Sequence, residues 1–456
     1  MYDVAIIGGG PGGYASALYA HNFGLSVVLV EKDEIGGTCL LRGCIPAKSW
    51  LQSAEVFDTV RRAAEFGVDT SEPTMNWPVA LARKQQVVDG LVRGLGGLLK
   101  ARNVEIVNGY GHLADGGVEV TGAEEGSRLL EARNVIIATG SVPRSIPGYA
   151  IDGQRIVSSD HALDWAAQPR RVAVIGGGVI GCEFVSLLSD VGSEVYVFEA
   201  LDQILPGTDP DAVKVLERAF KKKGVKIRTG TMVGAAQITD EGVSVPFGDE
   251  AVTVDVVLVA VGRAPVTDDL GLEAAGIGLD RGYITADLAT MQTLRPGVYA
   301  VGDVVAGTPQ LAHAGFAEGI AAITHIATGE AAPVDYRAIP LVVYTHPEIA
   351  SVGMTEAQAT VAGRKVKVTS HGLRGVGRAQ IQGHVDGTVK IVAEEDGPIL
   401  GATVVAQGAG EMIHELMYAV GWEALPQEAA RFIHAHPTVS EAIGESLLAA
   451  AGTSLH

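Results

Sequence analysis

Two copies of one local pattern constrain the fold of this chain more than any other feature. Each copy reads as a short β-branched strand, a turn with glycines at three fixed positions, a helical stretch, and a second strand that ends in glutamate. In both copies the first glycine precedes the glutamate by 23 residues. One such turn is a weak signal, but two with equal spacing predict two parallel α/β units. The marked residues are Gly8, Gly10, Gly13 and Glu31 in the first copy, and Gly176, Gly178, Gly181 and Glu199 in the second.

This pattern is typical of dinucleotide binding. The first glycine permits a tight turn, the second lets the backbone approach a pyrophosphate, and the third allows close packing of the helix. The helix N-terminus faces the phosphate charge, and the glutamate can accept hydrogen bonds from a ribose. The alternative for Glu31 and Glu199 is a solvated charge at the end of a strand.

The second glutamate also indicates which nicotinamide cofactor would bind. A carboxylate at position 199 would repel a 2′-phosphate, and residues 200–208 contain no arginine or lysine to receive one. The sequence therefore favours NAD over NADP.

Cys39 and Cys44 lie five positions apart, shortly after the first glycine-rich turn. On a regular helix this spacing gives roughly 8 to 9 Å between alpha carbons, beyond the ~7 Å limit for a disulfide. A bridge therefore requires a distorted turn, which Gly43 and Pro46 could provide. Such a strained bridge would be easily reduced, so the pair is predicted to be a redox-active dithiol. Two unpaired buried thiols are the alternative.

Composition restricts the compartment and the partners. The chain has 456 residues, enough for about three domains, and three cysteines, too few for an extracellular disulfide framework. Its formal charge is −19, which argues against nucleic acid or an anionic membrane as partner. The first strand begins directly after the start of the chain, which leaves no room for a targeting segment, and apolar runs such as 256–261 are short. We expect a soluble, cytoplasmic protein.

These features, together with further strings in the same order, resemble the flavoprotein pyridine nucleotide-disulfide oxidoreductases. Within that family the resemblance is closest to the members that oxidise dihydrolipoamide. The further strings are Ala138-Thr-Gly140, Val261-Gly-Arg-Ala-Pro265, Tyr299-Ala-Val-Gly-Asp303, Tyr344-Thr-His-Pro-Glu348 and His434-Ala-His-Pro-Thr-Val-Ser-Glu441.

The resemblance implies an α/β fold with two Rossmann-like domains, one for FAD and one for NAD, and a C-terminal α+β dimerisation domain. The implied boundaries are 1–145 for the FAD domain, 146–262 for the NAD domain, 263–335 for a central domain that completes the FAD site, and 336–456 for the dimerisation domain. A homodimer follows from the cross-subunit active site of the family.

The resemblance also assigns roles to individual residues. In the family pattern Cys39 exchanges with substrate, Cys44 faces the flavin, and Lys48 lies near the flavin and pairs with Glu183. His436, oriented by Glu441, would reach the dithiol of the other subunit. The implied FAD residues are Gly8, Gly10, Gly13, Glu31, Thr139, Gly140 and Asp303; the implied NAD residues are Gly176, Gly178, Gly181, Glu183, Glu199 and Gly262. No metal-binding residue is assigned.

The implied activity is oxidation of dihydrolipoamide through a Cys39/Cys44 disulfide and FAD, with reduction of NAD. The partner would be a lipoyl domain of an acyltransferase or carrier protein in 2-oxoacid dehydrogenase or glycine cleavage complexes. Because only a thiolate attacks a disulfide competently, a base is required, and His436 with Glu441 suits that task. His434 is the competing base.

Other activities stay open at this stage. The chain could be another NAD(P)H-dependent flavin disulfide reductase that acts on a small thiol, an NADH oxidase or diaphorase, or a binding subunit that uses FAD for structure. The C-terminus lacks the additional redox pair that a mercuric or large thioredoxin reductase would need.

Three local features of the sequence lead to further expectations. Arg42 could lower the pKa of a neighbouring thiol, or it could be a solvated cation. Cys182 should pack as a small apolar side chain. A helical region over 49–101 should be interrupted by Pro73, Pro78 and the glycines of 94–97, and a small β excursion should turn near Gly116, Gly122 and Gly126.

Overall fold

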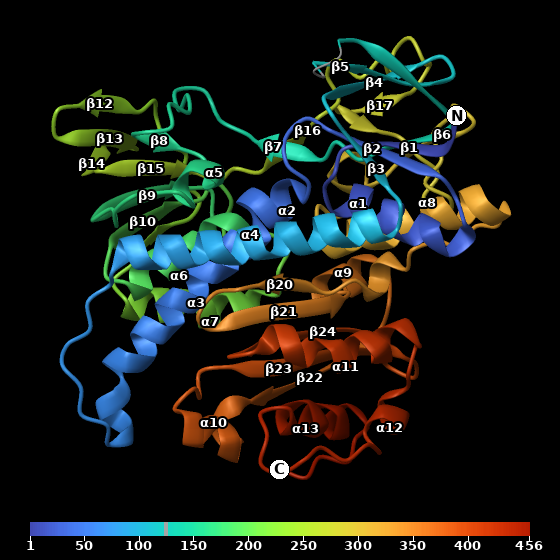
Figure 1. The fold of residues 1–456 in the computed structure, drawn as a ribbon. Helices are drawn as coiled ribbons and strands as arrows, with labels where there is room; N and C mark the ends of the chain where they lie inside the picture. Colours follow the sequence, from blue (N-terminus) through green and yellow to red (C-terminus); the bar gives the residue numbers. More distant parts are fainter. Residues whose placement is uncertain (123–125) are drawn as a thin grey trace.

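The computed structural model describes residues 1–122 and 126–456, and it divides into three sheet-based units along the chain. Figure 1 shows the first unit at the upper right, the second at the left and the third below them. Two units are built on parallel sheets and the third on an antiparallel sheet. The predicted α/β architecture with a separate C-terminal α+β unit is confirmed.

The first unit contains a parallel sheet extended by an antiparallel excursion. The parallel strands run in the order β3, β2, β1, β6, with the late strand β19 added beside β6. They are β1 (Tyr2–Ile7), β2 (Val27–Glu31), β3 (Glu105–Asn108), β6 (Arg128–Ile137) and β19 (Val298–Ala300). Strand β19 comes from far along the chain. It brings the residues near 300 to the carboxyl end of the parallel strands, where β1 also ends.

The excursion predicted near Gly116, Gly122 and Gly126 is present. Strands β4 (Tyr110–Ala114) and β5 (Gly117–Thr121) pair antiparallel with each other, and β5 pairs with the start of β6. The part of this turn at 123–125 lies outside the described residues.

The second unit repeats the parallel arrangement. Its sheet runs in the order β11, β10, β9, β15, β8, and a small antiparallel sheet of β12, β13 and β14 lies beside it. The strands are β8 (Ile156–Val157), β9 (Arg171–Ile175), β10 (Glu194–Phe198), β11 (Lys226–Arg228), β12 (Gln237–Thr239), β13 (Gly242–Phe247), β14 (Glu250–Val254) and β15 (Val256–Val259). A short ladder of β7 (Ser141–Pro143) with β16 (Arg263–Pro265) links the two crossings of the chain between this unit and the first. Strands β17 (Leu279–Asp280) and β18 (Tyr283–Ile284) form a separate local hairpin.

The third unit is an antiparallel sheet with helices on it. The strand order is β20, β21, β24, β23, β22. The strands are β20 (Leu341–Val343), β21 (Glu348–Gly353), β22 (Val366–Gly372), β23 (Thr388–Glu394) and β24 (Ile399–Ala406). Helix α13 packs on β22 and β23, whereas α6 of the second unit reaches β20, so these two helices lie toward opposite edges of the sheet.

Helices complete the three units. They are α1 (Pro11–Ala20), α2 (Gly37–Arg42), α3 (Cys44–Arg61), α4 (Trp77–Ala101), α5 (Ser159–Ala162), α6 (Val179–Asp190), α7 (Pro210–Lys222), α8 (Ala312–Thr328), α9 (Glu356–Val361), α10 (Gly377–Gln382), α11 (Ala409–Gly421), α12 (Pro426–Ala429) and α13 (Glu441–Ala450). Single 3₁₀ turns are η1 (His21–Phe23), η2 (Ala63–Phe66), η3 (Gly302–Val304), η4 (Tyr336–Ala338) and η5 (Leu373–Gly375).

The predicted interruption of α4 at the glycines of 94–97 is wrong. The helix runs unbroken from Trp77 to Ala101, and Pro78 lies in its first turn, where the missing N–H costs nothing. Val88, Val92, Leu95 and Leu99 form a buried stripe at helical spacing. Burial of that stripe outweighs the low helix propensity of glycines on the other faces.

Helix α3 anchors the first unit on the second. Trp50 of α3 is buried, and its indole N–H donates to the Leu163 carbonyl at 3.0 Å. The indole N–H of Trp77 donates to the Trp165 carbonyl at 2.7 Å. The ring centroids of Trp50 and Trp77 lie 4.3 Å apart. Since Cys44 begins α3, this packing fixes the second cysteine relative to the second unit.

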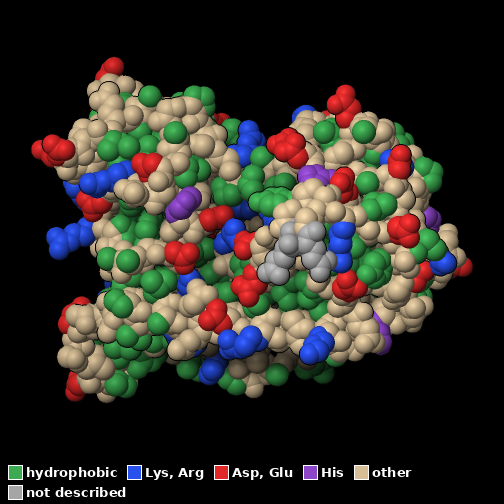
Figure 2. All heavy atoms as spheres, turned by 45° about the horizontal axis from the view of Figure 1, so that its top comes forward, with side chains coloured by type: hydrophobic (Ala, Val, Ile, Leu, Met, Phe, Trp, Pro, Cys, Tyr) green, Lys and Arg blue, Asp and Glu red, His purple; other side chains and the backbone are tan. Residues whose placement is uncertain are grey.

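Charged side chains of both signs lie on the surface of the molecule. Figure 2 shows acidic and basic side chains interspersed over the face that it draws. None of the helices within 1–122 and 126–456 combines the length and the hydropathy that a membrane crossing requires.

Candidate active site

The two glycine-rich turns have the same geometry. Gly8 and Gly176 have φ of +106° and +102°, in the left-handed region that favours glycine. A Cβ on Gly13 would lie 1.9 Å from the Gly8 carbonyl oxygen, and one on Gly181 would lie 2.0 Å from that of Gly176. Any side chain at the third glycine would therefore push the helix off the turn, as the sequence pattern predicts.

The two glutamates that end the second strands are also held alike. Glu31 accepts hydrogen bonds from the Gly9 N–H at 2.7 Å and from the Asp33 N–H at 2.9 Å. Glu199 accepts from the Gly177 N–H at 2.7 Å and from the Leu201 N–H at 2.9 Å. Each carboxylate is thus fixed against its glycine turn, so the alternative of a freely solvated charge does not describe either one.

Both turns fit a bound pyrophosphate. Helices α1 and α6 begin after Gly10 and Gly178 without a side-chain cap and without an acidic residue in the first turn, as far as the described residues show. Their first N–H groups and the positive end of each helix dipole are therefore available to an anion. A Cβ on Gly178 would meet no described atom within 4 Å beyond its chain neighbours, so the backbone there is open to a ligand.

The surroundings of the two turns differ. A Cβ on Gly10 would lie 3.7 Å from the Gly37 Cα, and one on Gly12 would lie 2.9 Å from Val301 Cγ2. Helix α8 packs against α1 so closely that a Cβ on Gly319 would lie 2.6 Å from Ser16 Oγ. The first turn is thus covered by later parts of the chain, whereas Gly178 faces open space.

The cysteine pair lies where two helices meet. Cys39 is in α2, Cys44 is the first residue of α3, and the chain bends at Gly43, where a Cβ would lie 2.8 Å from the Thr38 carbonyl oxygen. The predicted distortion at Gly43 is confirmed. Pro46 does not distort the chain, because it lies in the first turn of α3, where no N–H is needed.

The two cysteines are half-buried free thiols, joined by a hydrogen bond between their side chains. A hydrogen bond from Cys39 lowers the pKa of Cys44 to about 7, with help from the Lys48 charge and against the effect of burial. The hydrogen bond to Cys44 and burial raise the pKa of Cys39. In the reduced pair, Cys44 is therefore the thiol that ionises more readily.

Lys48 joins the first unit to the second and the third. Its Nζ lies 2.9 Å from both carboxylate oxygens of Glu183 on α6, and it lies over the ring of Tyr344, 4.6 Å from the centroid. Burial opposes the charge on Lys48, but Glu183 outweighs it, so the pKa of Lys48 is raised. The Tyr344 N–H donates to the same glutamate at 3.2 Å.

For Arg42 the structure favours the second interpretation, a solvated cation. Arg42 is exposed and its guanidinium forms an ion pair with Asp33. The cation that acts on Cys44 is Lys48, one turn into α3. Position 42 lies between the cysteines in the sequence, but its guanidinium pairs with Asp33.

Asp303 is connected to the dithiol segment by a chain of hydrogen bonds. Its carboxylate accepts from Ser141 Oγ at 2.6 Å, and Arg263 Nε donates to the same hydroxyl at 2.7 Å. Arg263 Nη2 donates to Thr38 Oγ1 at 3.3 Å, next to Cys39. Neither Ser141 nor Arg263 was predicted from the sequence to have a role. The signal that could have found the arginine is its place in the Val261-Gly-Arg-Ala-Pro265 string.

The remaining predicted cofactor residues lie around this chain. Thr139 Oγ1 donates to the Val266 carbonyl at 2.6 Å, and Gly140 accepts from the Val266 N–H at 2.9 Å. Gly262 has φ of +108° and accepts from the Arg144 N–H at 3.0 Å. These residues fold the chain between the two units.

The histidine–glutamate pair lies apart from the dithiol of its own chain. His436 Nδ1 lies 2.7 Å from Glu441 Oε1, which begins α13, and this hydrogen bond lowers the pKa of Glu441. The His436 side chain is 79% exposed. Because α13 packs on β22 and β23, the pair is near the sheet edge opposite the one that α6 reaches.

His434 is held differently. Its Nε2 lies 3.0 Å from Glu415 of α11, and a Cβ on Gly444 would lie 2.7 Å from its Nδ1. The hydrogen bond to Glu415 raises the pKa of His434. This histidine is enclosed between α11 and α13, whereas His436 is exposed.

Cys182 is fully buried in α6 and donates to the Gly177 carbonyl at 3.2 Å. Burial raises the pKa of its thiol. It packs as a small apolar side chain, as predicted.

Comparisons with known proteins agree with this arrangement over the whole chain. Residues 2–319 match the family described as pyridine nucleotide-disulphide oxidoreductase, and residues 339–447 match the dimerisation domain of that family. The dihydrolipoyl dehydrogenase of Bacillus subtilis (strain 168) is 40% identical over 100% of this chain and 99% of its own.

Two solved structures show the same fold. LpdA from Mycobacterium tuberculosis has a TM-score of 0.91 at 32% identity, with 98% of this chain and 99% of that chain covered. The HOCl-induced flavoprotein disulfide reductase RclA from Escherichia coli has a TM-score of 0.87 at 25% identity, with 98% and 99% covered. The chain belongs to the pyridine nucleotide-disulphide oxidoreductase family, and it is a flavin disulfide oxidoreductase with a dimerisation domain.

Proposed function

We propose that the protein is a dihydrolipoamide dehydrogenase, which oxidises dihydrolipoamide carried by a lipoyl domain and reduces NAD. The observation that carries this proposal is the Cys39/Cys44 pair with Lys48 beside it, in a chain 40% identical over its full length to a dihydrolipoyl dehydrogenase. The lipoyl domain would belong to the acyltransferase or carrier protein of a 2-oxoacid dehydrogenase or glycine cleavage complex.

In the first step a thiol of the substrate gives its proton to His436 of the partner subunit. The resulting thiolate attacks Cys39 Sγ of the oxidised Cys39–Cys44 bridge, and the bond between the two cysteines breaks. Cys44 leaves as a thiolate, which Lys48 stabilises because its charge lowers the pKa of that thiol. Glu441 supports the imidazolium that forms, through its 2.7 Å contact with His436 Nδ1.

In the second step the other substrate thiol attacks the substrate sulfur bound to Cys39 and closes the ring of lipoamide. Cys39 leaves and takes the proton that His436 holds, and one further proton goes to solvent. Two electrons have then moved from the substrate to the cysteine pair. Bound FAD would supply the transfer of this electron pair, together with the proton of Cys39, to NAD as a hydride equivalent, and the bond between Cys39 and Cys44 would re-form.

The assignment of FAD to the first turn and NAD to the second is part of this proposal. The cover over the first turn suits a cofactor that stays bound, and the open space at Gly178 suits one that exchanges. The fixed Glu199 carboxylate favours NAD, since a 2′-phosphate would lie against a like charge. Arg228 on the neighbouring strand is held over the Phe247 ring, 5.9 Å from its centroid.

A homodimer would complete the active site. The dimerisation domain exposes large apolar side chains, with Trp422 77%, Phe432 78% and Ile433 97% exposed. Burial of such side chains by a second copy would stabilise the dimer, and it would bring the exposed His436 to the partner's dithiol.

A second reading is a disulfide reductase that acts on a different small thiol, and the full-length likeness to RclA favours it over a diaphorase. The test is NADH formation from NAD and dihydrolipoamide by the purified holoprotein, with NADP in parallel. We expect turnover with NAD, at least tenfold less with NADP, and none in Cys44→Ser. If the protein binds FAD but does not turn over dihydrolipoamide, the result would contradict the proposal and favour the second reading. Reduction of a dye by NADH should persist in Cys39→Ser under both readings.

A further inference from the structure

One buried acid beside the flavin turn has no part in the mechanism above. Glu318 of α8 is fully buried, with 0% of its surface exposed. It lies on the helix that packs against α1, directly next to Gly319, whose missing side chain permits that packing. A carboxylate in such a place is costly unless its contacts are needed.

The two oxygens of Glu318 hold two different parts of the chain. Oε2 accepts a hydrogen bond from the Gly302 N–H at 2.6 Å, and Oε1 accepts one from the Tyr336 hydroxyl at 3.0 Å. Gly302 has φ of +77° and begins the turn that contains Asp303. Tyr336 lies three residues before the match to the dimerisation domain begins at 339.

The turn that Glu318 holds is the one that faces the flavin in our assignment. Asp303 follows Gly302 directly, and its carboxylate is fixed by Ser141 Oγ at 2.6 Å. The turn therefore has two supports: Ser141 on the side chain of Asp303, and Glu318 on the backbone before it. Loss of the second support would leave the backbone free to rotate at a glycine.

We propose that Glu318 is a positioning residue for the flavin, which fixes the Gly302–Asp303 turn through its carboxylate and joins that turn to the dimerisation domain through Tyr336. This inference rests on the assignment of FAD to the first unit. It gives the chain a direct connection between the cofactor site and the part that binds the second subunit.

The electrostatics of the site supply a signature that packing alone would not produce. Burial raises the pKa of Glu318 to about 7, against the hydrogen bonds from Gly302 and Tyr336, and the nearby Asp303 charge adds to the rise. An ionised carboxylate accepts a stronger hydrogen bond than a neutral one. The turn should therefore be held more firmly at pH 8 than at pH 6.

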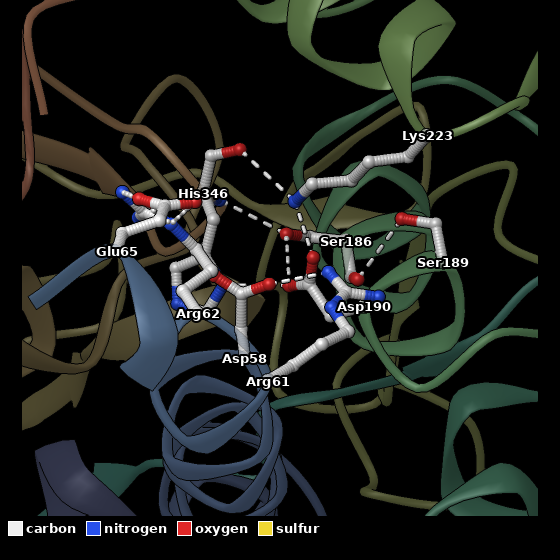
Figure 3. Close-up of polar contacts among 9 residues, drawn as sticks. All are labelled: Asp58, Arg61, Arg62, Glu65, Ser186, Ser189, Asp190, Lys223 and His346. Atoms are coloured by element: carbon white, nitrogen blue, oxygen red, sulfur yellow. Dashed lines mark hydrogen bonds and ion pairs between the residues drawn. The ribbon is translucent and has the colours of Figure 1, made fainter. Parts of the chain in front are cut away.

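A second buried acid offers a matched control. Asp190 of α6 is also 0% exposed and also reaches the dimerisation domain, through His346 Nδ1 at 2.6 Å. Figure 3 shows it between His346 and Lys223, with Ser186 beside it. Lys223 forms an ion pair with Asp190, and the His346 N–H donates to Ser186 Oγ at 2.9 Å. Among residues 1–122 and 126–456, no hydrogen bond or ion pair joins this cluster to the Gly302–Asp303 turn, so its loss should affect folding but not the cofactor.

The experiment is the rate of FAD release from the holoprotein, followed by the fluorescence of free FAD, with thermal unfolding of each variant recorded alongside. We expect Glu318→Ala to release FAD about tenfold faster, the effect of one lost charge-assisted hydrogen bond. Tyr336→Phe should give a smaller increase, and Asp190→Asn should stay within about twofold of the unchanged protein.

The isosteric variant separates positioning from packing. The unchanged protein should release FAD more slowly at pH 8 than at pH 6, and Glu318→Gln should show no such difference. If Glu318→Ala does not fold, Glu318→Gln and Tyr336→Phe carry the test. FAD release at the unchanged rate in the Glu318 variants, or an equal acceleration in Asp190→Asn, would overturn the proposal. A protein that never retains FAD would instead contradict the assignment of the first unit.

Discussion

The two dinucleotide units have the same glycine-rich turn with its glutamate, here called the cradle, but the surroundings of the two cradles differ. In both, a left-handed glycine opens the turn, a third glycine permits contact with the helix, and a glutamate accepts the N–H of the second residue of the turn at 2.7 Å. Around the first cradle, α8 and the Gly37 segment close in, whereas Gly178 of the second faces open space. The local pattern thus determines what kind of ligand fits, and the packing around it determines whether that ligand stays.

The difference also locates the chemistry. The first unit contributes the cysteine pair through α2 and α3, and the second contributes Glu183, which holds Lys48 from the other side. The dithiol therefore lies where the two units meet. In our account the retained flavin and the exchangeable nicotinamide face each other across this junction.

The strongest test of the comparison uses the cysteines of the two units. Cys39→Ser should lower dihydrolipoamide oxidation by at least about a thousandfold, because no sulfur remains to receive the substrate thiolate. Cys182→Ala in the second unit should change it less than about twofold, since that buried thiol does no chemistry. Steady-state NADH formation measures both. Equal losses in the two variants would contradict the division between the units.

The ion pair that joins the units gives the next largest effect. Lys48→Met should raise the pKa of Cys44 above its value of about 7, because the Lys48 charge that favours the thiolate is lost. At pH 7 less thiolate is then present, and we expect turnover to fall about tenfold, with partial recovery as the pH rises toward 9. The pH dependence of alkylation of the reduced protein reports the shift. An unchanged alkylation profile would show that Cys39 alone sets the pKa of Cys44.

Substitutions of Glu31 and Glu199 test whether two turns of the same geometry hold different cofactors. Glu199→Gln should raise the KM for NAD about fivefold and reduce the preference for NAD over NADP, while the FAD content stays the same. Glu31→Gln should instead lower the FAD content after gel filtration and leave the KM for NAD unchanged. The absorbance ratio of flavin to protein and the KM values separate the two effects. The reverse outcome would exchange the two cofactor assignments.

The smallest expected effect concerns the helices that cover the units. Helix α4 of the first unit contains Gly94, where a Cβ would meet no described atom within 4 Å beyond its neighbours, whereas α7 of the second unit contains no glycine. Gly94→Ala should raise the free energy of unfolding by about 0.5–1 kcal/mol, and Ala219→Gly in α7 should lower it by a similar amount. Denaturant unfolding measures both. A weakened dimer in Gly94→Ala would indicate that a second copy covers this face of α4.

Much of the site could be predicted because it depends on residue types at short, fixed spacings in the sequence. The glycines and glutamates of both cradles, the break at Gly43 and the role of Cys182 all follow from short-range patterns. Pro46 was misjudged because position in the sequence does not tell which turn of a helix a proline occupies. For the same reason two interpretations of Arg42 stayed open, since the sequence does not tell which partner its side chain meets. The unbroken α4 was missed because burial of one face outweighs glycines on the others.

The rest could not be predicted because it joins residues that are far apart in the chain. Ser141, Arg263 and Thr38 become neighbours only when β7 and β16 pair. Glu318 reads as one acid in a small-residue helix, and its contacts with Gly302 and Tyr336 depend on the return of the chain to the first sheet. Long-range contacts of this kind leave no periodic signal in a single sequence.

The central claim is that the Cys39/Cys44 pair carries the electron pair from substrate to NAD. The most direct measurement is an anaerobic single turnover, in which the holoprotein receives one equivalent of dihydrolipoamide, its thiols are counted, and NAD is then added. Our account predicts two new protein thiols before NAD, and their loss with formation of one NADH afterwards. NADH formation without a change in protein thiols, or the same yield from Cys44→Ser, would contradict it.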